Sequence, residues 1–326
     1  MVEFKILSKA GSEVMVVPDM PTTFPVAEAS KVISNFGTIR FQRIVGDGFE
    51  AWLSKYVAKH SAELSARADL ETIEMYIALY NQFESTWDGI GMPTSRPLQF
   101  GFSYCPHIHN KVKLIKGMQY ETLDFHIKPY MLEPFRKIYR EVDKFLNRVE
   151  SKQFATMNFE CLLSPEMIVV LHDMKRYRPR PELVSGFIKA KLQELLIYAF
   201  DTAFKESPPS KITITKELKD KAYDARVILE SRVKNPPTVS ALSQLVLTND
   251  TTMQYLFKHF FKCTVSEYSQ LIRLEVGRGL LLNTSLTLDD IAYETGYYDA
   301  SSFSGAFKKR YGCTPGEYKK AGRKPR

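Results

Sequence analysis

The chain has 326 residues, of which 44% are hydrophobic, and this composition excludes a globally disordered protein. Its length favours two domains over one. No stretch approaches the roughly 18–20 apolar residues that a membrane helix needs, and the first twenty residues lack the basic-then-apolar order of a signal peptide. We therefore expect a cytoplasmic protein that does not bind a membrane.

The formal net charge is +8, and the basic excess lies toward the C-terminal end. From residue 215 onward there are 18 Lys and Arg against 12 Asp and Glu, whereas the preceding residues hold 27 against 25. A basic surface at one end suits a polyanion, although a charge-rich tail is by itself more often a solvated surface. The four cysteines are widely separated, which predicts reduced thiols and no metal cluster.

Residues 1 to about 130 predict short strands. Residues 38–45 alternate apolar and polar side chains and precede the turn sequence Gly46-Asp47-Gly48. Several strands at this spacing predict an antiparallel sandwich or barrel. The other strands are expected at 72–83, 98–104, 112–115 and 120–127.

The pattern then changes to helices, which we expect at 133–150, 166–174 and 182–205. The last has an apolar stripe too broad for a solvent-facing helix. It is interpreted either as packing against the barrel or as a homodimer interface, and one helix can serve both purposes. Ser207-Pro208-Pro209-Ser210 favours a linker. The predicted domains are 1–206 for ligand sensing and dimerisation, a linker 207–214, a DNA-binding domain 215–320 and a basic tail 321–326.

Two helix-turn-helix units are predicted in the C-terminal third. In the first, helices at 239–246 and 250–261 flank a turn, and Asn249 is a natural N-cap for the second helix. In the second unit, Thr287 caps a helix at 288–295, Gly296 permits a left-handed turn, and Asp299 caps a helix at 300–311. One continuous helix, 266–282, is expected between the two units. The predicted class is therefore α+β, with an N-terminal β-domain and an all-α C-terminal domain.

The segments RLEVGRGLLL (273–282), IAYETGY (291–297), SFS (302–304), FKKRYG (307–312) and PGEY (315–318) closely resemble the signature of the AraC/XylS family of regulators. Much of that signature, including Ile291, Ala292, Phe303 and Phe307, has the period of core residues. Leu247 and Lys262 depart from the family, which usually has glycine at these positions. The resemblance implies a transcription regulator, an activator in many members, that binds promoter DNA through both units and recruits RNA polymerase.

Base readout is expected from the early, exposed positions of the second helix in each unit, because an α-helix enters the major groove by its N-terminal part. Gln254 could pair with adenine through two hydrogen bonds, but a solvated surface glutamine is the alternative. The candidate residues of the second unit have small side chains, which favours phosphate anchoring and shape readout there. The base-contact candidates are Thr251, Gln254, Tyr255, Ala300, Ser301, Ser304 and Gly305, and the phosphate candidates are Asn249, Lys258, Asp299, Ser302, Lys308, Lys309 and Arg310.

The resemblance further implies a cupin-like N-terminal domain that binds a small-molecule effector and forms a homodimer. Aromatic residues could line the effector pocket, although aromatic residues in strands are more often core. The candidates are Trp52, Tyr56, Tyr76, Tyr80 and Trp87.

Three other functions compete with this interpretation. Gly101, His107 and His109 fit the opening of metal-binding cupins, but the later acidic and histidine ligands are missing, so we expect no metal, no cofactor and no enzyme. DNA-repair methyltransferases can carry a similar DNA-binding module, but they need clustered thiols. An N-terminal domain that serves only for dimerisation stays open as the third alternative.

Overall fold

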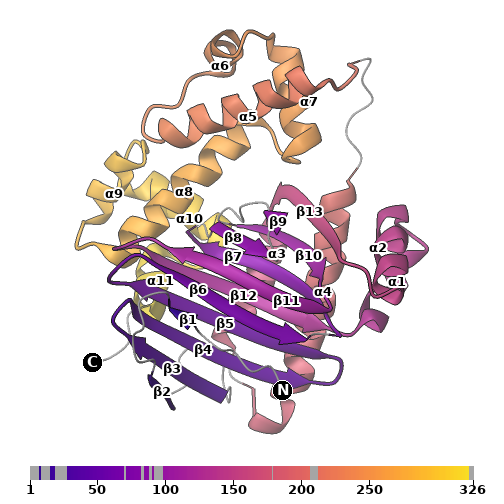
Figure 1. Ribbon diagram of the computed structural model, residues 1–326. Helices are drawn as coiled ribbons and strands as arrows, with labels where there is room; N and C mark the ends of the chain where they lie inside the picture. Colours follow the sequence, from indigo (N-terminus) through magenta and orange to yellow (C-terminus); the bar gives the residue numbers. More distant parts are fainter. Residues whose placement is uncertain are drawn as a thin grey trace. The chain divides into compact units, whose positions relative to one another are not determined.

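The computed structural model describes residues 7–8, 15–18, 28–69, 71–81, 84–87, 90–91, 98–177, 179–205 and 212–322. The chain forms two compact units, which we call the N-terminal unit (residues 1–159 and 173–200) and the C-terminal unit (residues 160–172 and 201–326) (Figure 1). The C-terminal unit thus includes a segment, 160–172, that the predicted domain boundaries assign to the first domain.

The N-terminal unit is built on two antiparallel sheets. Among the described residues, the larger sheet has the strand order β13-β10-β7-β12-β5-β4-β3-β2 and the smaller sheet has the order β1-β6-β11-β8-β9. The strands are β1 (Leu7–Ser8), β2 (Met15–Pro18), β3 (Glu28–Ser34), β4 (Gly37–Gly46), β5 (Phe49–Ala58), β6 (Ala62–Asp69), β7 (Ile73–Tyr80), β8 (Glu84–Trp87), β9 (Ile90–Gly91), β10 (Gln99–Tyr104), β11 (His107–Leu114), β12 (Gln119–Ile127) and β13 (Ala155–Leu162).

These strands confirm the predicted class in its sandwich form. The two sheets are separate among the described strands, so they do not close into a single barrel. All five predicted strand regions contain strands. Among the described residues, eight further strands lie outside those regions, namely β1, β2, β3, β5, β6, β8, β9 and β13. β13 lies between predicted helices, where the sequence pattern was interpreted as helical.

The predicted helices that follow are present and begin within three residues of their expected positions. The elements are the 3-10 helix η1 (Pro129–Leu132), α1 (Glu133–Arg136), α2 (Arg140–Glu150), α3 (Pro165–Arg176), the 3-10 helix η2 (Pro181–Leu183) and α4 (Val184–Phe204). Within the described residues, no helix is long and apolar enough to cross a membrane.

One face of the larger sheet packs against helices. Phe102, Met75 and Phe125 lie opposite one another across β10, β7 and β12, and all three are fully buried. The Phe200 ring of α4 stacks on Phe102 at 5.0 Å and contacts Phe135 of α1 at 4.6 Å between ring centroids. The apolar stripe of α4 is therefore buried inside its own unit, as the first of the two interpretations expected.

The opposite face of the larger sheet closes against the smaller sheet at one end. Val32, Ile39 and Tyr120 of the larger sheet form one apolar cluster with Leu64 of β6 and Leu114 of β11. Burial of these side chains contributes roughly 1.5–3 kcal/mol each to folding, before the entropy cost of ordering the chain is subtracted. This cluster joins the two sheets.

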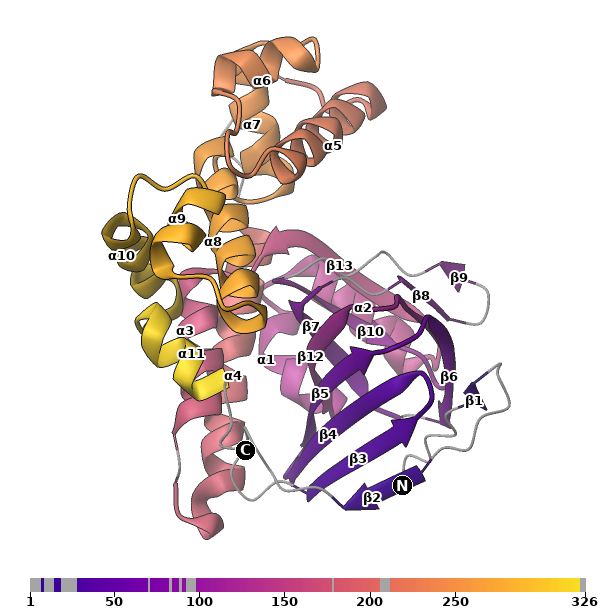
Figure 2. The same cartoon turned by 90° about the vertical axis from the view of Figure 1, so that its left-hand side faces the viewer.

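The C-terminal unit is helical beyond the linker region. Its helices confirm the two predicted helix-turn-helix units, α6–α7 and α9–α10, and α8 runs from one to the other (Figure 2). The helices are α5 (Lys216–Ser231), α6 (Val239–Leu245), α7 (Asp250–Phe260), α8 (Val265–Asn283), α9 (Leu288–Glu294), α10 (Ala300–Tyr311) and α11 (Pro315–Gly322).

The predicted helix caps are formed. The side chains of Asn249, Thr287 and Asp299 accept hydrogen bonds from the backbone N–H groups of Thr252, Asp290 and Ser302 at 2.8, 3.2 and 2.7 Å. Gly296 has φ +74°, the left-handed turn expected between α9 and α10. These local signals explain why the boundaries in this unit match the sequence prediction closely.

The two departures from the family pattern, Leu247 and Lys262, also adopt the left-handed conformation, with φ values of +56° and +57°. The turns thus keep the geometry that glycine would favour. For a residue with a side chain this conformation costs about 1–2 kcal/mol. Leu247 is moreover 81% exposed, so its side chain recovers little of that cost by packing.

Candidate nucleic-acid interface

The recognition helices α7 and α10 are each anchored by a buried aromatic row. In the first helix-turn-helix unit, Phe257 packs on Phe261 and Tyr268 at 5.0 and 5.6 Å between ring centroids. In the second helix-turn-helix unit, the rings of Phe303 and Tyr311 contact Phe307 at 5.5 and 4.3 Å between centroids. Since the rings on each of these helices lie four residues apart, each helix turns one face inward and leaves the opposite face away from the core.

A buried ion pair lies where α8, α10 and α11 meet. Arg278 donates to Glu275 from Nε and Nη2 at 3.0 and 2.9 Å, and Tyr311 Oη donates to the same carboxylate at 2.5 Å. Burial would lower the pKa of Arg278, but the charge of Glu275 raises it well above its ordinary value. Tyr318 Oη lies 3.3 Å from Arg278 Nη1, which connects α11 to the pair. This network positions α10 on α8.

A close approach between helices also positions α10. A Cβ atom on Gly277 of α8 would lie 2.5 Å from the Phe303 ring, so only glycine leaves room for that ring. The sequence analysis identified Phe303 as a core residue but assigned no role to Gly277. The spacing of apolar residues could not reveal it, because the contact is between two helices.

The predicted base-contact residues lie on the N-terminal turns of the two helices, with different exposure. Thr251, Ser301 and Gly305 are exposed, whereas the remaining four are half-buried. The Gln254 Oε1 atom is buried and has no hydrogen-bond partner in the described structure. The half-buried residues are Gln254, Tyr255, Ala300 and Ser304.

The predicted phosphate-contact residues divide into two groups. Lys258, Lys308 and Lys309 are exposed, as is the N-terminal turn residue Ser302. In contrast, the side-chain oxygens of Asn249 and Asp299 are engaged as helix caps. The Ser302 backbone N–H lowers the pKa of Asp299, which keeps that carboxyl ionised and therefore unsuited to a phosphate.

Arg310 is placed differently from its two lysine neighbours. It is only 8% exposed, and its Nη2 donates to the Leu163 carbonyl oxygen at 2.7 Å within the C-terminal unit. Burial lowers its pKa. The sequence analysis assigned Lys308, Lys309 and Arg310 alike to phosphate contacts. A helix turns by 100° per residue, however, and Arg310 faces inward.

The predicted effector residues Trp52, Tyr56 and Tyr76 share one face of the larger sheet. Asp124 of β12 lies directly opposite both Trp52 and Tyr76, so these side chains project on the same side, away from the helices. All three aromatic residues are half-buried. The side chains of Tyr80 and Trp87 lie outside the described residues.

Sequence reasoning missed the polar residues of this face. Burial raises the pKa of Asp124 well above its ordinary value, and the nearby charge of Glu74 raises it further. Thr122 Oγ1 donates to Asp124 at 2.7 Å, and Ser103 Oγ lies 3.3 Å from Glu74. Burial likewise raises the pKa of Tyr56 and of Tyr76. Strand alternation predicts which residues share a face, but the partner strands were needed to bring these together.

The Gly101 position, a candidate for a metal-site motif, has a packing role in the structure. A Cβ atom there would lie 2.2 Å from Tyr76 Oη, so glycine lets the Tyr76 side chain lie across β10. His107 is exposed, and the His109 side chain lies outside the described residues. Within the described part of the chain, no three His, Cys, Asp or Glu side chains come together as metal ligands.

We expect the replacement Asp124→Asn to stabilise the protein at neutral pH, by about 1–2 kcal/mol. The folded-state pKa of Asp124 is raised, so this residue favours folding most at low pH. Its contribution is lost as the pH rises from the unfolded value of about 3.9 through the folded value. Urea unfolding across this pH range should therefore show a shallower loss of stability in the variant. Asp201→Asn, at an exposed position, is the control, and equal pH slopes in wild type and Asp124→Asn would refute the prediction.

Comparisons with known proteins concern mainly the helical C-terminal region. Residues 242–321 match the family model described as a helix-turn-helix domain. The transcriptional activator RhaR of Mannheimia succiniciproducens is 38% identical over 69 residues, which are 21% of this chain and 25% of that protein. The match therefore spans only a quarter of the length of this relative.

Two solved structures are among those that match parts of the chain. A transcriptional regulator of Chromobacterium violaceum, described as having an AraC-type DNA-binding domain, is 23% identical with a TM-score of 0.32 and covers 33% of this chain and 96% of that one. ToxT of Vibrio cholerae is 13% identical with a TM-score of 0.32, and covers 84% of this chain and 98% of that one. The predicted AraC/XylS resemblance is confirmed by the match of residues 242–321 to the helix-turn-helix family model and by the similarity to RhaR.

Proposed function

Because residues 242–321 form an AraC-type helix-turn-helix domain, we propose that this protein is a sequence-specific DNA-binding regulator that activates transcription from promoter DNA. One observation carries the proposal: two capped helix-turn-helix units are joined by the single helix α8. At 19 residues, α8 is about 28 Å long. That length is comparable to the roughly 34 Å between successive major grooves on one face of DNA. We propose that α7 and α10 enter adjacent grooves.

The base contacts are assigned by position on the N-terminal turns of α7 and α10, and the phosphate contacts by exposure and charge. We propose that Thr251, Gln254 and Tyr255 read bases from α7, while Ala300, Ser301, Ser304 and Gly305 approach bases closely from α10. Lys258, Lys308 and Lys309 are exposed cations and suit phosphates, whereas the buried Arg310 is held by Leu163. The exposed Ser302 can offer its side-chain hydroxyl to a phosphate, since its backbone N–H donates to Asp299.

The first test is DNA binding across a salt series, with genomic fragments from upstream of the protein's own gene. Gln254→Ala is expected to reduce the preference for the selected fragment by about tenfold, because a good contact to a base contributes about 1–3 kcal/mol. Lys308→Ala is expected to weaken binding to all fragments alike and to reduce the salt slope by about 1.

Lys144→Ala is the matched control, because Lys144 is an exposed lysine on α2 of the N-terminal unit. It should leave affinity, selectivity and salt slope unchanged. If the wild type binds no fragment better than random DNA, the proposed function fails. If Gln254→Ala keeps full selectivity, only the assignment of that base contact fails.

We further propose that a small-molecule effector binds at the face formed by Trp52, Tyr56 and Tyr76, and that the protein acts as a homodimer. Asp124 and Glu74 support this assignment, since polar groups among aromatic residues are typical of ligand sites. Both tryptophans of the chain, Trp52 and Trp87, are in the predicted effector set, so tryptophan fluorescence tests this directly. A low-molecular-mass cell extract should change the emission of wild type but change it less in Tyr76→Ala.

The same measurements also distinguish an effector-binding N-terminal unit from one that serves only for dimerisation. An effector must bind the DNA-competent state with a different affinity in order to regulate, so the extract should also change DNA affinity. If sedimentation shows a dimer but neither fluorescence nor DNA affinity responds, the unit serves for dimerisation alone.

A further inference from the structure

Tyr298 is the most exposed large hydrophobic side chain in the described part of the chain, at 96%. It lies in the turn between α9 and α10, directly before Asp299, the N-cap of α10. Such exposure leaves almost none of its ring or its hydroxyl in contact with the rest of the protein. The fold therefore gives no packing reason for a tyrosine here, and the surface of the side chain is available to a partner.

The turn that carries Tyr298 is held on both sides. The preceding residue, Tyr297, is directed inward, where its ring packs on Phe303 at 5.5 Å between centroids. The following residue, Asp299, accepts a hydrogen bond from the Ser302 backbone N–H at 2.7 Å. A tyrosine has only two side-chain torsions to order, so a ring presented from a fixed turn loses little conformational entropy when it meets a partner.

Tyr298 is also close to the proposed base contacts of α10. It lies two residues before Ala300, so their Cα atoms are at most about 7.6 Å apart. A recognition helix enters the major groove by its N-terminal part, and the sugar–phosphate backbone runs along the edge of that groove. A residue just before the N-cap of α10 is therefore placed at the edge, beside the DNA backbone.

The N-terminus of α10 is a poor phosphate site in itself. A helix N-terminus usually attracts a phosphate, but this one already holds the Asp299 carboxylate. The Ser302 backbone N–H lowers the pKa of that carboxyl, which keeps it negatively charged. A phosphate must therefore be bound away from the cap, by a side chain that extends from the turn. The phenol O–H of Tyr298 is such a donor, and it carries no charge.

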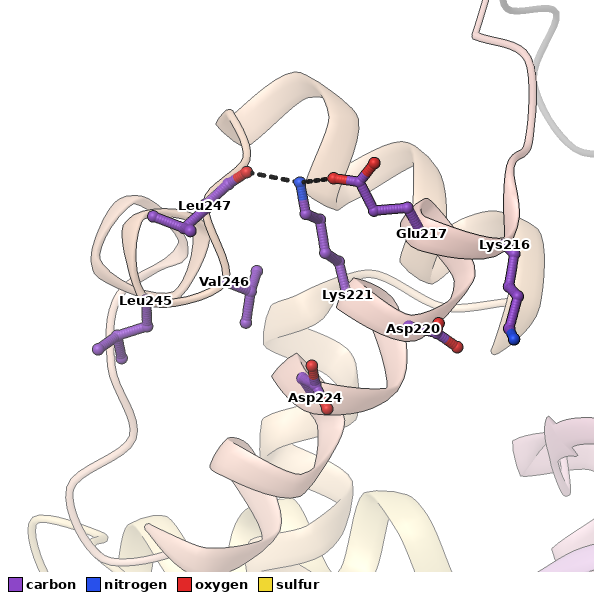
Figure 3. A pocket seen from close by; sticks show the side chains of 8 residues that line it. All are labelled: Lys216, Glu217, Asp220, Lys221, Asp224, Leu245, Val246 and Leu247. Carbon is purple, nitrogen blue, oxygen red and sulfur yellow. Dashed lines mark hydrogen bonds and ion pairs between the residues drawn. The ribbon is translucent and has the colours of Figure 1, made fainter.

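The first helix-turn-helix unit is arranged differently. Its residue before the cap is Thr248, which is half-buried. The exposed side chain of that turn is Leu247, which lines a groove beside α5, where Lys221 Nζ donates to the Leu247 carbonyl oxygen at 3.0 Å (Figure 3). The first unit instead carries the larger base-contact candidates, Gln254 and Tyr255. The candidates on α10 have small side chains, and a large side chain before its cap compensates for them.

We propose that Tyr298 is a DNA-backbone contact of the second helix-turn-helix unit, with its ring packed on a deoxyribose at the groove edge and its Oη donating to the adjacent phosphate. The inference rests on the proposed function as a DNA-binding protein. The contact carries no charge and touches no base edge, so it adds affinity without adding salt dependence or sequence preference. It thus differs from the contacts proposed for Lys308 and Gln254.

The test compares the affinity of the full-length protein for the selected DNA fragment and for a random duplex of the same length, across a salt series. Tyr298→Ala should weaken binding to both by about tenfold, which corresponds to a contact of about 1.4 kcal/mol. Its salt slope and its preference for the selected fragment should match those of wild type. Tyr298→Phe keeps the ring and should lose about threefold, the contribution of the hydroxyl.

Methylphosphonate groups, substituted one at a time for phosphates of the fragment, identify the partner of the hydroxyl. At the contacted phosphate, wild type should lose about threefold more affinity than Tyr298→Phe, which has no hydroxyl left to lose its acceptor. If the two proteins respond alike at every position, the hydroxyl contact is refuted.

Tyr130→Ala is the matched control, because Tyr130 is another exposed tyrosine, at 51%, in the N-terminal unit. It should leave DNA affinity unchanged. Urea unfolding of Tyr298→Ala should match wild type, since an almost fully exposed side chain contributes little packing. Unfolding at a lower urea concentration would indicate a structural role and overturn the inference.

The remaining outcomes separate this inference from the proposed function. The inference is overturned if Tyr298→Ala binds both duplexes like wild type, if its salt slope falls as expected for Lys308→Ala, or if it loses preference for the selected fragment, which would indicate a base contact. If wild type selects no fragment, the proposed sequence-specific function fails, but binding to the random duplex still decides the role of Tyr298. If wild type binds no DNA, both fail.

Discussion

Replacement of Glu275 by alanine is expected to destabilise the C-terminal unit by about 3–5 kcal/mol, the cost of leaving one member of a buried ion pair without its partner. Arg278 is 4% exposed, and Glu275 accepts hydrogen bonds from its Nε and Nη2 atoms at 3.0 and 2.9 Å. Without the carboxylate, Arg278 and Tyr311 lose their common acceptor at a site where each is only 4% exposed. Urea unfolding followed by circular dichroism measures the change.

Two further variants distinguish charge from shape in this network. Glu275→Gln keeps the acceptor oxygen and should lose less stability than Glu275→Ala. The double replacement Glu275→Met/Arg278→Met should also be less harmful than Glu275→Ala, because it leaves no unpaired charge. If all three variants unfold at the same urea concentration as wild type, the ion pair does not stabilise this unit. DNA affinity should decrease in parallel with stability, since the pair positions α10.

Replacement of Gly296 by alanine is expected to cost about 3 kcal/mol, within the range for mutations that combine backbone strain with a clash. Its φ of +74° disfavours any residue with a side chain. The new Cβ atom would in addition lie 2.1 Å from the Lys234 carbonyl oxygen. Arg273 Nη2 lies 3.3 Å from the same carbonyl, so the carbonyl cannot shift without disturbing that contact.

Gly316→Ala is the matched control, because a Cβ atom there meets no atom within 4 Å. Gly316 lies in α11, where alanine is favoured over glycine by up to about 1 kcal/mol. The control should therefore be neutral or slightly stabilising. A Gly296→Ala variant as stable as this control would show that the turn between α9 and α10 can relax, and would remove the reason for glycine there.

The DNA-binding helices could be predicted from sequence because their boundaries depend on neighbouring residues. A cap such as Asn249 or Asp299 bonds the N–H group three residues later, and Gly296 sets its own turn. The strands of the N-terminal unit were predicted less completely, since a strand is stabilised by partners distant in sequence. β13, for example, follows two helices in the chain yet belongs to the larger sheet.

The sequence by itself determined the class of the molecule and the two helix-turn-helix units, because periodicity, helix caps and the AraC/XylS signature depend on residues that are close together in the chain. It also supplied the candidate residues for DNA contact. Only the tertiary structure decided which candidates are accessible. It buried Arg310 against Leu163 and brought Asp124 beside Trp52 and Tyr76. The physical reason is that accessibility and charge environment depend on contacts between segments far apart in the chain.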